Sequence, residues 1–487
     1  MKKYVLIALL LLFFTAQSFA QGPVMIAGKV ENAVGSKVNV YYITNPVSGE
    51  RQSYSADLEE DGTFQIELSL EEARELTFRH GREISRMFAF PNDVLKVSLD
   101  AEKFDESIHY GGEGPGVASS NFLAMYFLKY EDGARAEKQQ QMFKDADPSR
   151  FQTFQDQRRM DMQRDLEMGV EEKELPMVFQ TYMRDQILYS WALSLINYPL
   201  YHSYYNQKPL EEVEIPEGYY SVLQSVPLNS KTAADMQVYQ QFVGAWLRKK
   251  YDESLAGEKP ADMDQYNLGL ISFAAEKLDG RALSQYQAGL IRESLKYGNP
   301  LSIEPAYQAF INEEGNAAFA DALKPTYEMA MKLAPGKMAP DFQLKDLEGN
   351  ERSLSDFRGK VIYLDFWASW CGPCRREMPS ARELKARFKE KDVVFLYVSI
   401  DENEEAWRKA AAEEELAGPA VVWTKGGSSE VPVSYGIEGI PNYFLINRDG
   451  TIALSNPGRP SSAPLVDQQI QQALDADIES SSEANKE

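Results

Sequence analysis

The chain contains 487 residues, too many for one compact hydrophobic core, so we expect two or three domains. A hydrophobic fraction of 44% and a charged fraction of 26% are typical of globular proteins and exclude a disordered or collagen-like chain. The formal net charge of -23 disfavours nucleic acid and anionic lipid as partners, and its simplest consequence is solubility.

Residues 1–20 have the pattern of a secretory signal peptide. Lys2 and Lys3 precede an apolar run over residues 4–14, and small residues before Gln21 predict cleavage near Ala20. An uncleaved membrane anchor is the alternative, but the run is shorter than the roughly 20 residues that span a bilayer. No cysteine stands directly after the run, which argues against a lipoprotein. We therefore expect an exported, soluble protein of the periplasm.

Residues 24–111 are predicted to form short β-strands. Segments such as 38–42, 64–68 and 94–98 alternate or cluster β-branched and aromatic residues, and turn residues such as those at 60–62 separate them. This pattern predicts an antiparallel β-sandwich. The region contains no nucleophile–base pair and no metal-ligand spacing.

The region from residue 118 to residue 334, which follows a glycine-rich linker, is predicted to be all-α. Apolar residues recur every fourth position along one predicted helix, namely Phe179, Met183, Ile187, Trp191 and Leu195. A second helix is predicted over residues 281–297, with Gly298 and Pro300 as stop signals. The tyrosine-rich segment 198–205 could line a ligand groove, although packing between helices is the commoner role of such residues.

The C-terminal third is predicted to be a separate α/β domain. Strand and helix signals alternate over residues 335–475. Residues 476–487, rich in Ser, Glu, Asp and Ala, are predicted to form a disordered tail. The expected protein is therefore multidomain, with a β-sandwich, a central all-α region and a C-terminal α/β domain.

The only two cysteines, Cys371 and Cys374, are separated by Gly372 and Pro373. An exported protein that used disulfides to stabilise its fold would have several widely spaced cysteines, and this pair closes too small a loop to stabilise much. A zinc site would need further ligands, and the histidines lie far upstream without ligand spacing. The pair therefore indicates redox chemistry.

The sequence around the pair predicts a strand, a tight turn and a helix. The apolar run 361–367 is typical of a strand buried on both faces, and the cysteines follow it at the start of a helical pattern. Unpaired N–H groups and the helix dipole stabilise a thiolate there, and Pro373 suits the first turn. We expect Cys371 to lie at the exposed tip and attack substrate disulfides, and Cys374 to resolve the mixed disulfide.

Residues 366–374, with the sequence FWASWCGPC, closely resemble the active-site stretch of thioredoxins. The wider segment 339–460 resembles the TlpA/ResA-type extracytoplasmic branch of that family. The resemblance implies a thioredoxin fold for residues 335–475 and thiol–disulfide oxidoreductase activity. The upstream β and helical regions are more loosely similar to regions that precede such modules in exported bacterial oxidoreductases.

The resemblance assigns roles to two acidic residues. Asp365 matches the buried carboxylate behind the second cysteine; burial should raise its pKa and make it a proton acceptor for Cys374. A core aspartate held by backbone hydrogen bonds is the alternative. Thioredoxins place a lysine opposite this aspartate, where this chain has Tyr397. Glu377 matches an acidic residue that influences cysteine pKa and partner recognition, although it could simply complement the helix dipole.

The resemblance also predicts a substrate-binding surface. Pro441 matches a cis-proline whose preceding backbone is free to pair with a substrate strand, although an ordinary trans proline is the alternative. Trp370 and Ile440 are expected to flank the substrate groove, and Gly372 and Pro373 to complete it.

A protein-disulfide reductase is the leading functional hypothesis, with isomerase activity left open. The Gly-Pro dipeptide resembles that of thioredoxin, with a potential of about -270 mV, rather than that of strong oxidants near about -120 mV. The implied partners are disulfide-bonded proteins and a membrane electron donor, and no cofactor is expected besides the cysteine pair. Clients could be apocytochromes, as in cytochrome c maturation, or mispaired secreted proteins.

Two alternatives remain at the sequence level. Residues 339–342 and 354–360 also resemble peroxiredoxins, but a thiol peroxidase has a threonine three residues before its reactive cysteine, where this chain has Ala368. In the other alternative, the first 330 residues form a partner-binding module, or mediate self-association, and the redox domain is accessory.

Overall fold

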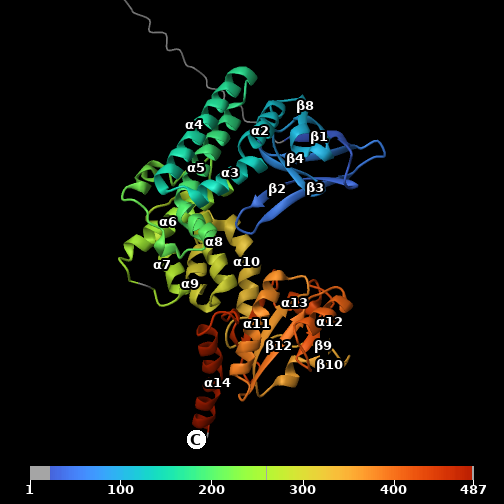
Figure 1. The fold of residues 1–487 in the computed structure, drawn as a ribbon, viewed down its shortest axis with the longest axis vertical. Helices are drawn as coiled ribbons and strands as arrows, with labels where there is room; N and C mark the ends of the chain where they lie inside the picture. The colour runs from blue at the N-terminus through green and yellow to red at the C-terminus, as the bar shows by residue number, and fades with distance from the viewer. Residues whose placement is uncertain (1–21, 259, 485–487) are drawn as a thin grey trace, which may run out of the picture. The chain divides into compact units, whose positions relative to one another are not determined.

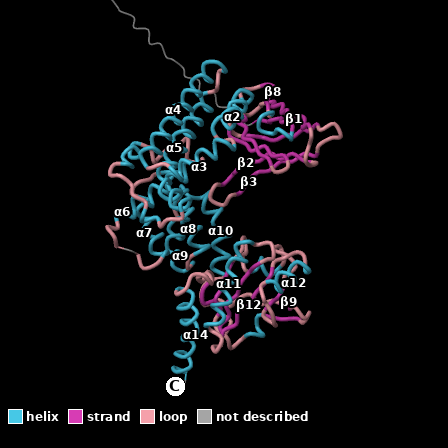
Figure 2. The backbone as a smooth tube through the Cα atoms, in the orientation of Figure 1, coloured by secondary structure: helices cyan, strands magenta, loops and turns pink. Residues whose placement is uncertain are grey.

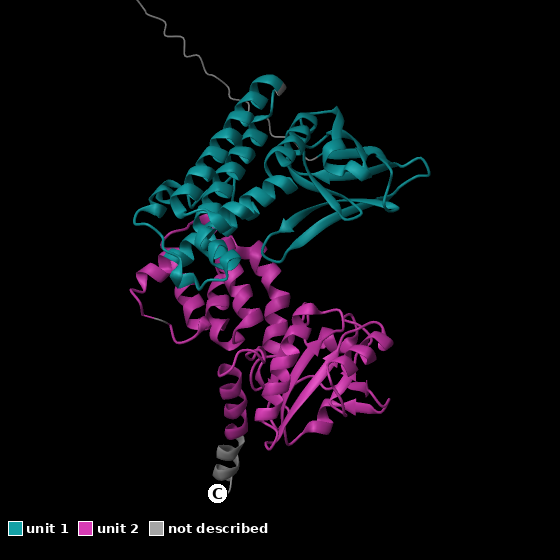
Figure 3. Cartoon of the chain, viewed as in Figure 1, with its two compact units in different colours: residues 1–249 teal, residues 250–487 magenta. Residues whose placement is uncertain are grey.

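The computed structural model describes residues 22–258 and 260–484 (Figures 1 and 2). The predicted signal peptide, residues 1–20, lies outside the described residues. The chain divides into two compact units, residues 1–249 and 250–487 (Figure 3). This division falls inside helix α6 (Gln237–Ser254), within the predicted all-α region. The helices after residue 250 therefore group with the C-terminal sheet. The domain boundaries expected from the sequence, at residues 118, 334 and 475, stay a prediction.

Two four-stranded sheets form the N-terminal part of unit 1. Their orders are β4-β1-β7-β8 and β3-β2-β5-β6. The strands are β1 (Gly22–Glu31), β2 (Lys37–Asn45), β3 (Glu50–Asp57), β4 (Thr63–Leu70), β5 (Arg74–His80), β6 (Glu83–Ala89), β7 (Val94–Asp100) and β8 (His109–Glu113). Side chains from both sheets share one buried cluster, in which the rings of Phe64 and Phe78 lie 5.8 Å apart. The predicted β-sandwich is thus confirmed, with one parallel pair, β1 and β7, among antiparallel ones.

Helices follow the sheets in unit 1, as predicted. They are α2 (Gly116–Tyr130), α3 (Gly133–Asp145), α4 (Pro148–Lys173) and α5 (Met177–Asn206), before α6, whereas the short α1 (Phe104–Ser107) lies between β7 and β8. The five apolar residues of the predicted stripe are all buried on α5. In the tyrosine-rich segment, Tyr198 is buried and donates a hydrogen bond to the carbonyl of Ala146, at 2.6 Å. Tyr198 therefore packs between helices, whereas Tyr204 is 73% exposed.

Between the end of α6 and the sheet, the described residues of unit 2 form four α-helices. They are α7 (Met263–Ala275), α8 (Gly280–Tyr297), α9 (Pro300–Ile311) and α10 (Ala317–Lys332). Helix α8 confirms the helix predicted over residues 281–297. Pro300 occupies the first turn of α9, where its missing N–H costs nothing.

The sheet of unit 2 has seven strands in the order β10-β9-β13-β12-β11-β14-β15. They are β9 (Gln343–Asp346), β10 (Glu351–Ser353), β11 (Val361–Trp367), β12 (Val393–Ser399), β13 (Val421–Trp423), β14 (Asn442–Ile446) and β15 (Ile452–Leu454). Strand β11 is buried at every position and pairs parallel with β12 and antiparallel with β14. The associated helices are α11 (Gly372–Arg387), α12 (Glu404–Glu413), α13 (Glu430–Ser434) and α14 (Leu465–Ala484). This arrangement confirms the predicted α/β thioredoxin fold.

Residues 476–484 differ from the prediction of a disordered tail over residues 476–487, and residues 485–487 lie outside the described residues. Helix α14 continues as far as Ala484. The segment contains alanine and glutamate, which favour helix, and no glycine or proline that would end it.

Among the described residues, no helix has the length and apolarity needed to cross a membrane.

Candidate active site

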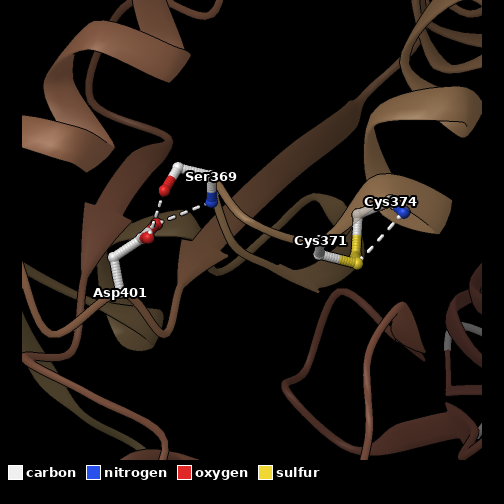
Figure 4. Close-up of a disulfide and its surroundings, with 4 residues drawn as sticks. All are labelled: Ser369, Cys371, Cys374 and Asp401. Carbon is white, nitrogen blue, oxygen red and sulfur yellow. Dashed lines mark hydrogen bonds between the residues drawn. A yellow bond between two sulfur atoms is a disulfide. The ribbon is translucent and has the colours of Figure 1, made fainter. Parts of the chain in front are cut away.

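Both cysteines lie at the N-terminus of α11, directly after the buried strand β11, as the sequence predicts. Cys371 is the N-cap residue, and its Sγ accepts a hydrogen bond from the backbone N–H of Cys374, at 3.1 Å (Figure 4). Pro373 occupies the first turn of the helix. A sulfur that accepts an N–H bond at a helix N-terminus is stabilised as a thiolate once the pair is reduced.

The structure shows the oxidised form, with a disulfide between Cys371 and Cys374. The expectation that Cys371 lies at an exposed tip is wrong for this form, because Cys371 is only 4% exposed and Cys374 only 1%. Both sulfurs are joined to each other and belong to the hydrophobic core cluster of the sheet. The neighbouring Trp370 is 67% exposed and takes the outermost position instead.

Asp365 lies in β11, at the centre of the sheet, and is 3% exposed. Desolvation by burial raises the pKa of its carboxyl group to about 8, and the nearby charge of Glu377 contributes to the increase. In the described part of the chain, no group donates a hydrogen bond to Asp365 Oδ1. The predicted direction of the pKa shift is confirmed, and a pKa near neutrality suits a group that exchanges protons.

Two tyrosines flank Asp365 across the sheet. The strand register pairs Asp365 with Tyr397 on β12 and with Tyr443 on β14. The structure thus places Tyr397 opposite Asp365, where thioredoxins carry a lysine. Burial, followed by the charge of Asp365, raises the pKa of both tyrosines, so their hydroxyl groups stay neutral. A neutral tyrosine does not stabilise an ionised Asp365 as a lysine would.

Glu377 lies in α11 and contacts the loop that follows β15. Its carboxylate accepts hydrogen bonds from the backbone N–H of Ser461, at 3.0 Å, and from the Ser461 hydroxyl, at 2.9 Å. Because the Glu377 charge also raises the pKa of Asp365, the two carboxyl groups are coupled. Glu377 therefore holds the loop after β15 and adds to the raised pKa of Asp365.

The predicted substrate-binding residues lie at the same end of the sheet as the disulfide. The Ile440–Pro441 peptide bond is cis, as predicted. Because β14 runs antiparallel to β11, its first residue, Asn442, lies beside the end of β11, from which the chain continues to Cys371. Ile440 and Pro441 are half-buried, whereas Gly372 and Pro373 are exposed.

Two residues that the sequence motifs did not indicate, Ser369 and Asp401, hold the loop before Cys371. Asp401, which is 1% exposed, accepts hydrogen bonds from the Ser369 backbone N–H at 2.9 Å and from its hydroxyl at 2.5 Å (Figure 4). The Ser399 hydroxyl also donates to Asp401, at 2.8 Å. The sequence contained one signal for this contact. Ser369 and Asp401 each follow the end of one of two adjacent parallel strands, and the ends of such strands lie side by side.

The site is therefore built for exchange between thiols and disulfides. It combines two cysteines at a helix N-terminus, a buried carboxyl group with a raised pKa and a neighbouring cis-proline. Within residues 22–258 and 260–484, no group of three or more metal-ligating side chains occurs.

Comparisons with known proteins match the C-terminal third of the chain. A family model described as Redoxin matches residues 334–470. Thiol-disulfide oxidoreductase ResA from Bacillus thuringiensis subsp. konkukian is 37% identical over 134 residues, which cover 28% of this chain and 76% of that protein. Thioredoxin-like protein YneN from Bacillus subtilis is 32% identical over 147 residues, which cover 30% of this chain and 81% of YneN.

Solved structures match the same share of the chain. The thioredoxin domain of a thiol-disulfide oxidoreductase from Bacteroides vulgatus is 33% identical, with a TM-score of 0.27. The match covers 29% of this chain and 99% of that domain.

Substitution of Asp365 should change how stability depends on pH. With a folded-state pKa of about 8 against an ordinary 3.8, the folded protein keeps a proton that the unfolded chain releases. The free energy of unfolding therefore falls as pH rises from about 4 to about 8. Asp365→Asn should flatten this decline and stabilise the oxidised protein by about 2 kcal/mol or more at pH 8. Urea denaturation at pH 5 and pH 8 measures this.

The control for this experiment is Asp392→Asn, because the side chain of Asp392 is 62% exposed. The control should keep the pH dependence of the unchanged protein. An equal pH dependence in Asp365→Asn and the control would contradict the assignment.

Loss of the contact between Ser369 and Asp401 should make reduced Cys371 less reactive. Ser369→Ala removes one hydrogen bond, so Cys371 is held less firmly at the N-cap position. We expect alkylation of reduced Cys371 at pH 7 to slow about threefold to tenfold. Ser369→Thr keeps both donors and should restore the rate. Equal rates in Ser369→Ala and Ser369→Thr would show that this contact does not position Cys371.

Proposed function

Since the chain belongs to the ResA-type thiol-disulfide oxidoreductases, we propose that it acts in the periplasm as a protein-disulfide reductase. The observation that carries the proposal is the Cys371-Gly372-Pro373-Cys374 pair at the N-terminus of α11, with Asp365 buried on the adjoining strand. The signal-peptide pattern of residues 1–20 supports the location.

In the proposed reaction, the reduced dithiol passes two electrons to a disulfide of the client protein. The Cys371 thiolate attacks one client sulfur, which forms a mixed disulfide and releases the other client sulfur as a thiolate. Cys374 then attacks Cys371 Sγ, which forms the Cys371–Cys374 disulfide and releases the second client thiolate. The client is reduced by two electrons, and the enzyme ends in the oxidised form that the structure shows.

Asp365 handles the proton of the second step. When ionised, its carboxylate accepts the proton of Cys374 and so makes that sulfur nucleophilic. Because its pKa is raised to about 8, Asp365 carries a proton much of the time at neutral pH and can return it to a departing thiolate. Burial of Asp365 and, after it, the charge of Glu377 raise this pKa and so set the pH range in which the exchange occurs.

The direction of electron flow is assigned from the dipeptide between the cysteines. Gly372-Pro373 is the dipeptide of thioredoxin, a reductant. A reductase in an oxidising compartment must be reduced again after each turnover, so the proposal includes a membrane electron donor. The cysteine pair is the only redox group that this chemistry needs. Isomerase activity uses the same first step, and differs in that the client itself resolves the mixed disulfide.

Thiol peroxidase activity is the less favoured alternative. Ala368 occupies the position at which peroxiredoxins carry a threonine, and its side chain has no hydroxyl to bind peroxide. A role in which the first 330 residues bind partners is compatible with the reductase proposal.

Substitution of the resolving cysteine should trap the clients. In Cys374→Ser the first step still occurs, but nothing resolves the mixed disulfide on Cys371. We expect disulfide-linked adducts to accumulate in the periplasm of the producing cells, where mass spectrometry can identify the clients. The double variant Cys371→Ser/Cys374→Ser should trap none. If Cys374→Ser accumulates no adducts either, Cys371 is not the attacking thiol.

The redox potential distinguishes a reductase from an oxidase. We expect the Cys371–Cys374 couple to lie much closer to about -270 mV than to about -120 mV. Equilibration with dithiothreitol or glutathione buffers, followed by alkylation and mass spectrometry, measures the reduced fraction. A potential near that of disulfide-forming enzymes would overturn the reductase assignment.

A further inference from the structure

The last turn of α8 contacts the loop that carries the cis-proline. Lys296 forms an ion pair with Glu438, and Nη2 of Arg292 lies 4.0 Å from the same carboxylate. Glu438 precedes Pro441 by three residues, so this contact lies at the predicted substrate-binding loop. All these residues belong to unit 2.

The same turn contacts a second loop of the active site. The side-chain amide of Asn456 donates a hydrogen bond to the carbonyl of Tyr297, at 2.8 Å. Asn456 lies in the loop after β15, which also carries Ser461, the hydrogen-bond partner of Glu377. The end of α8 therefore connects the cis-proline loop to the loop that holds Glu377.

Helix α10 fixes the start of the cis-proline loop. Leu333, just after α10, is buried in the same hydrophobic cluster as the two cysteines, and Met329 packs against that cluster. At Gly436 a Cβ atom would lie only 2.8 Å from Cγ of Met329, and the φ of +61° favours glycine. This close packing makes α10, like α8, an integral part of the catalytic unit.

The end of α8 presents an exposed aromatic side chain. Tyr297 is 66% exposed, and Trp370, next to Cys371, is 67% exposed. Exposed aromatic residues are the side chains that protein-binding surfaces use most effectively, because they bury a large area at a small entropic cost. A disulfide within a polypeptide brings flanking chain across the neighbouring loops, whereas a small disulfide contacts little beyond the dithiol.

We propose that the last turn of α8, through Tyr297, forms part of the surface that binds the disulfide-bonded client polypeptide. This inference rests on the proposed reductase function and adds a specificity-determining element to it. The family match begins at residue 334, so α8 lies outside the part of the chain that the family model describes. The helical segment thereby gives this enzyme a preference for polypeptide disulfides over small ones.

The test measures kcat/KM of one variant of the whole chain with two substrates, a polypeptide disulfide and a small disulfide. Tyr297→Ser removes the ring but keeps the carbonyl that accepts the Asn456 hydrogen bond. We expect it to lower the ratio of kcat/KM for insulin to kcat/KM for oxidised glutathione about threefold to tenfold, chiefly through KM for insulin. The control is Tyr204→Ser, which alters an exposed tyrosine near the end of α5 and should leave the ratio unchanged.

A charge reversal tests the contact with the cis-proline loop. Glu438→Lys places three cations together and should push the loop away from α8, which lowers the same ratio. The double variant Lys296→Glu/Glu438→Lys restores an ion pair of reversed sign and should recover most of the ratio. Circular dichroism of each variant checks that it is folded.

The outcomes separate this inference from the proposed function. If the unchanged protein fails to reduce insulin, the reductase proposal fails. If it reduces insulin and Tyr297→Ser leaves the substrate ratio unchanged, the α8 surface is not a client-binding surface. A change of sedimentation mass in Tyr297→Ser without a change in the ratio would assign Tyr297 to self-association and would also overturn the inference.

Discussion

The hydrogen bond from the Cys374 N–H to the Cys371 sulfur is the interaction that the rest of the site serves. It exists because Cys371 is the N-cap residue of α11, and it favours the anionic form of the Cys371 sulfur once the pair is reduced. The fully buried strand β11 fixes where the helix begins, and the contact between Ser369 and Asp401 fixes the path of the chain between strand and helix. A small displacement of this loop would lengthen that hydrogen bond. The anionic form of Cys371 would then be less stable, although no residue of the pair had changed.

The buried carboxyl group of Asp365 lowers the stability of the fold above about pH 4. Burying a carboxyl group in the centre of a sheet destabilises the protein at pH values where the group would otherwise be ionised. Tyr397 and Tyr443 flank Asp365 with neutral hydroxyl groups, and Glu377 adds a further negative charge. Burial and, after it, the charge of Glu377 raise the pKa of Asp365, and neither tyrosine supplies the cation that would lower it.

The catalytic unit is larger than the segment that its relatives share. The family match covers residues 334–470, but the compact unit begins at residue 250. Helices α8 and α10 contact the loops beside the dithiol, so substitutions far upstream in the sequence can displace these loops. Since exchange chemistry needs little more than the dithiol, elements added around it are a direct way to select among clients.

The sequence alone determined the local features of the site. A continuous apolar run predicted β11, the following cysteines and Pro373 predicted the start of α11, and the family spacing predicted the cis bond at Pro441. These features depend on neighbouring residues or short motifs, which a sequence displays directly. The tertiary structure decided the rest: Cys371 is buried in the oxidised form, α14 continues to Ala484, Asp401 holds Ser369, and Lys296 pairs with Glu438. The last two contacts join residues separated by 32 and 142 positions, and only strand register and helix packing bring such residues together.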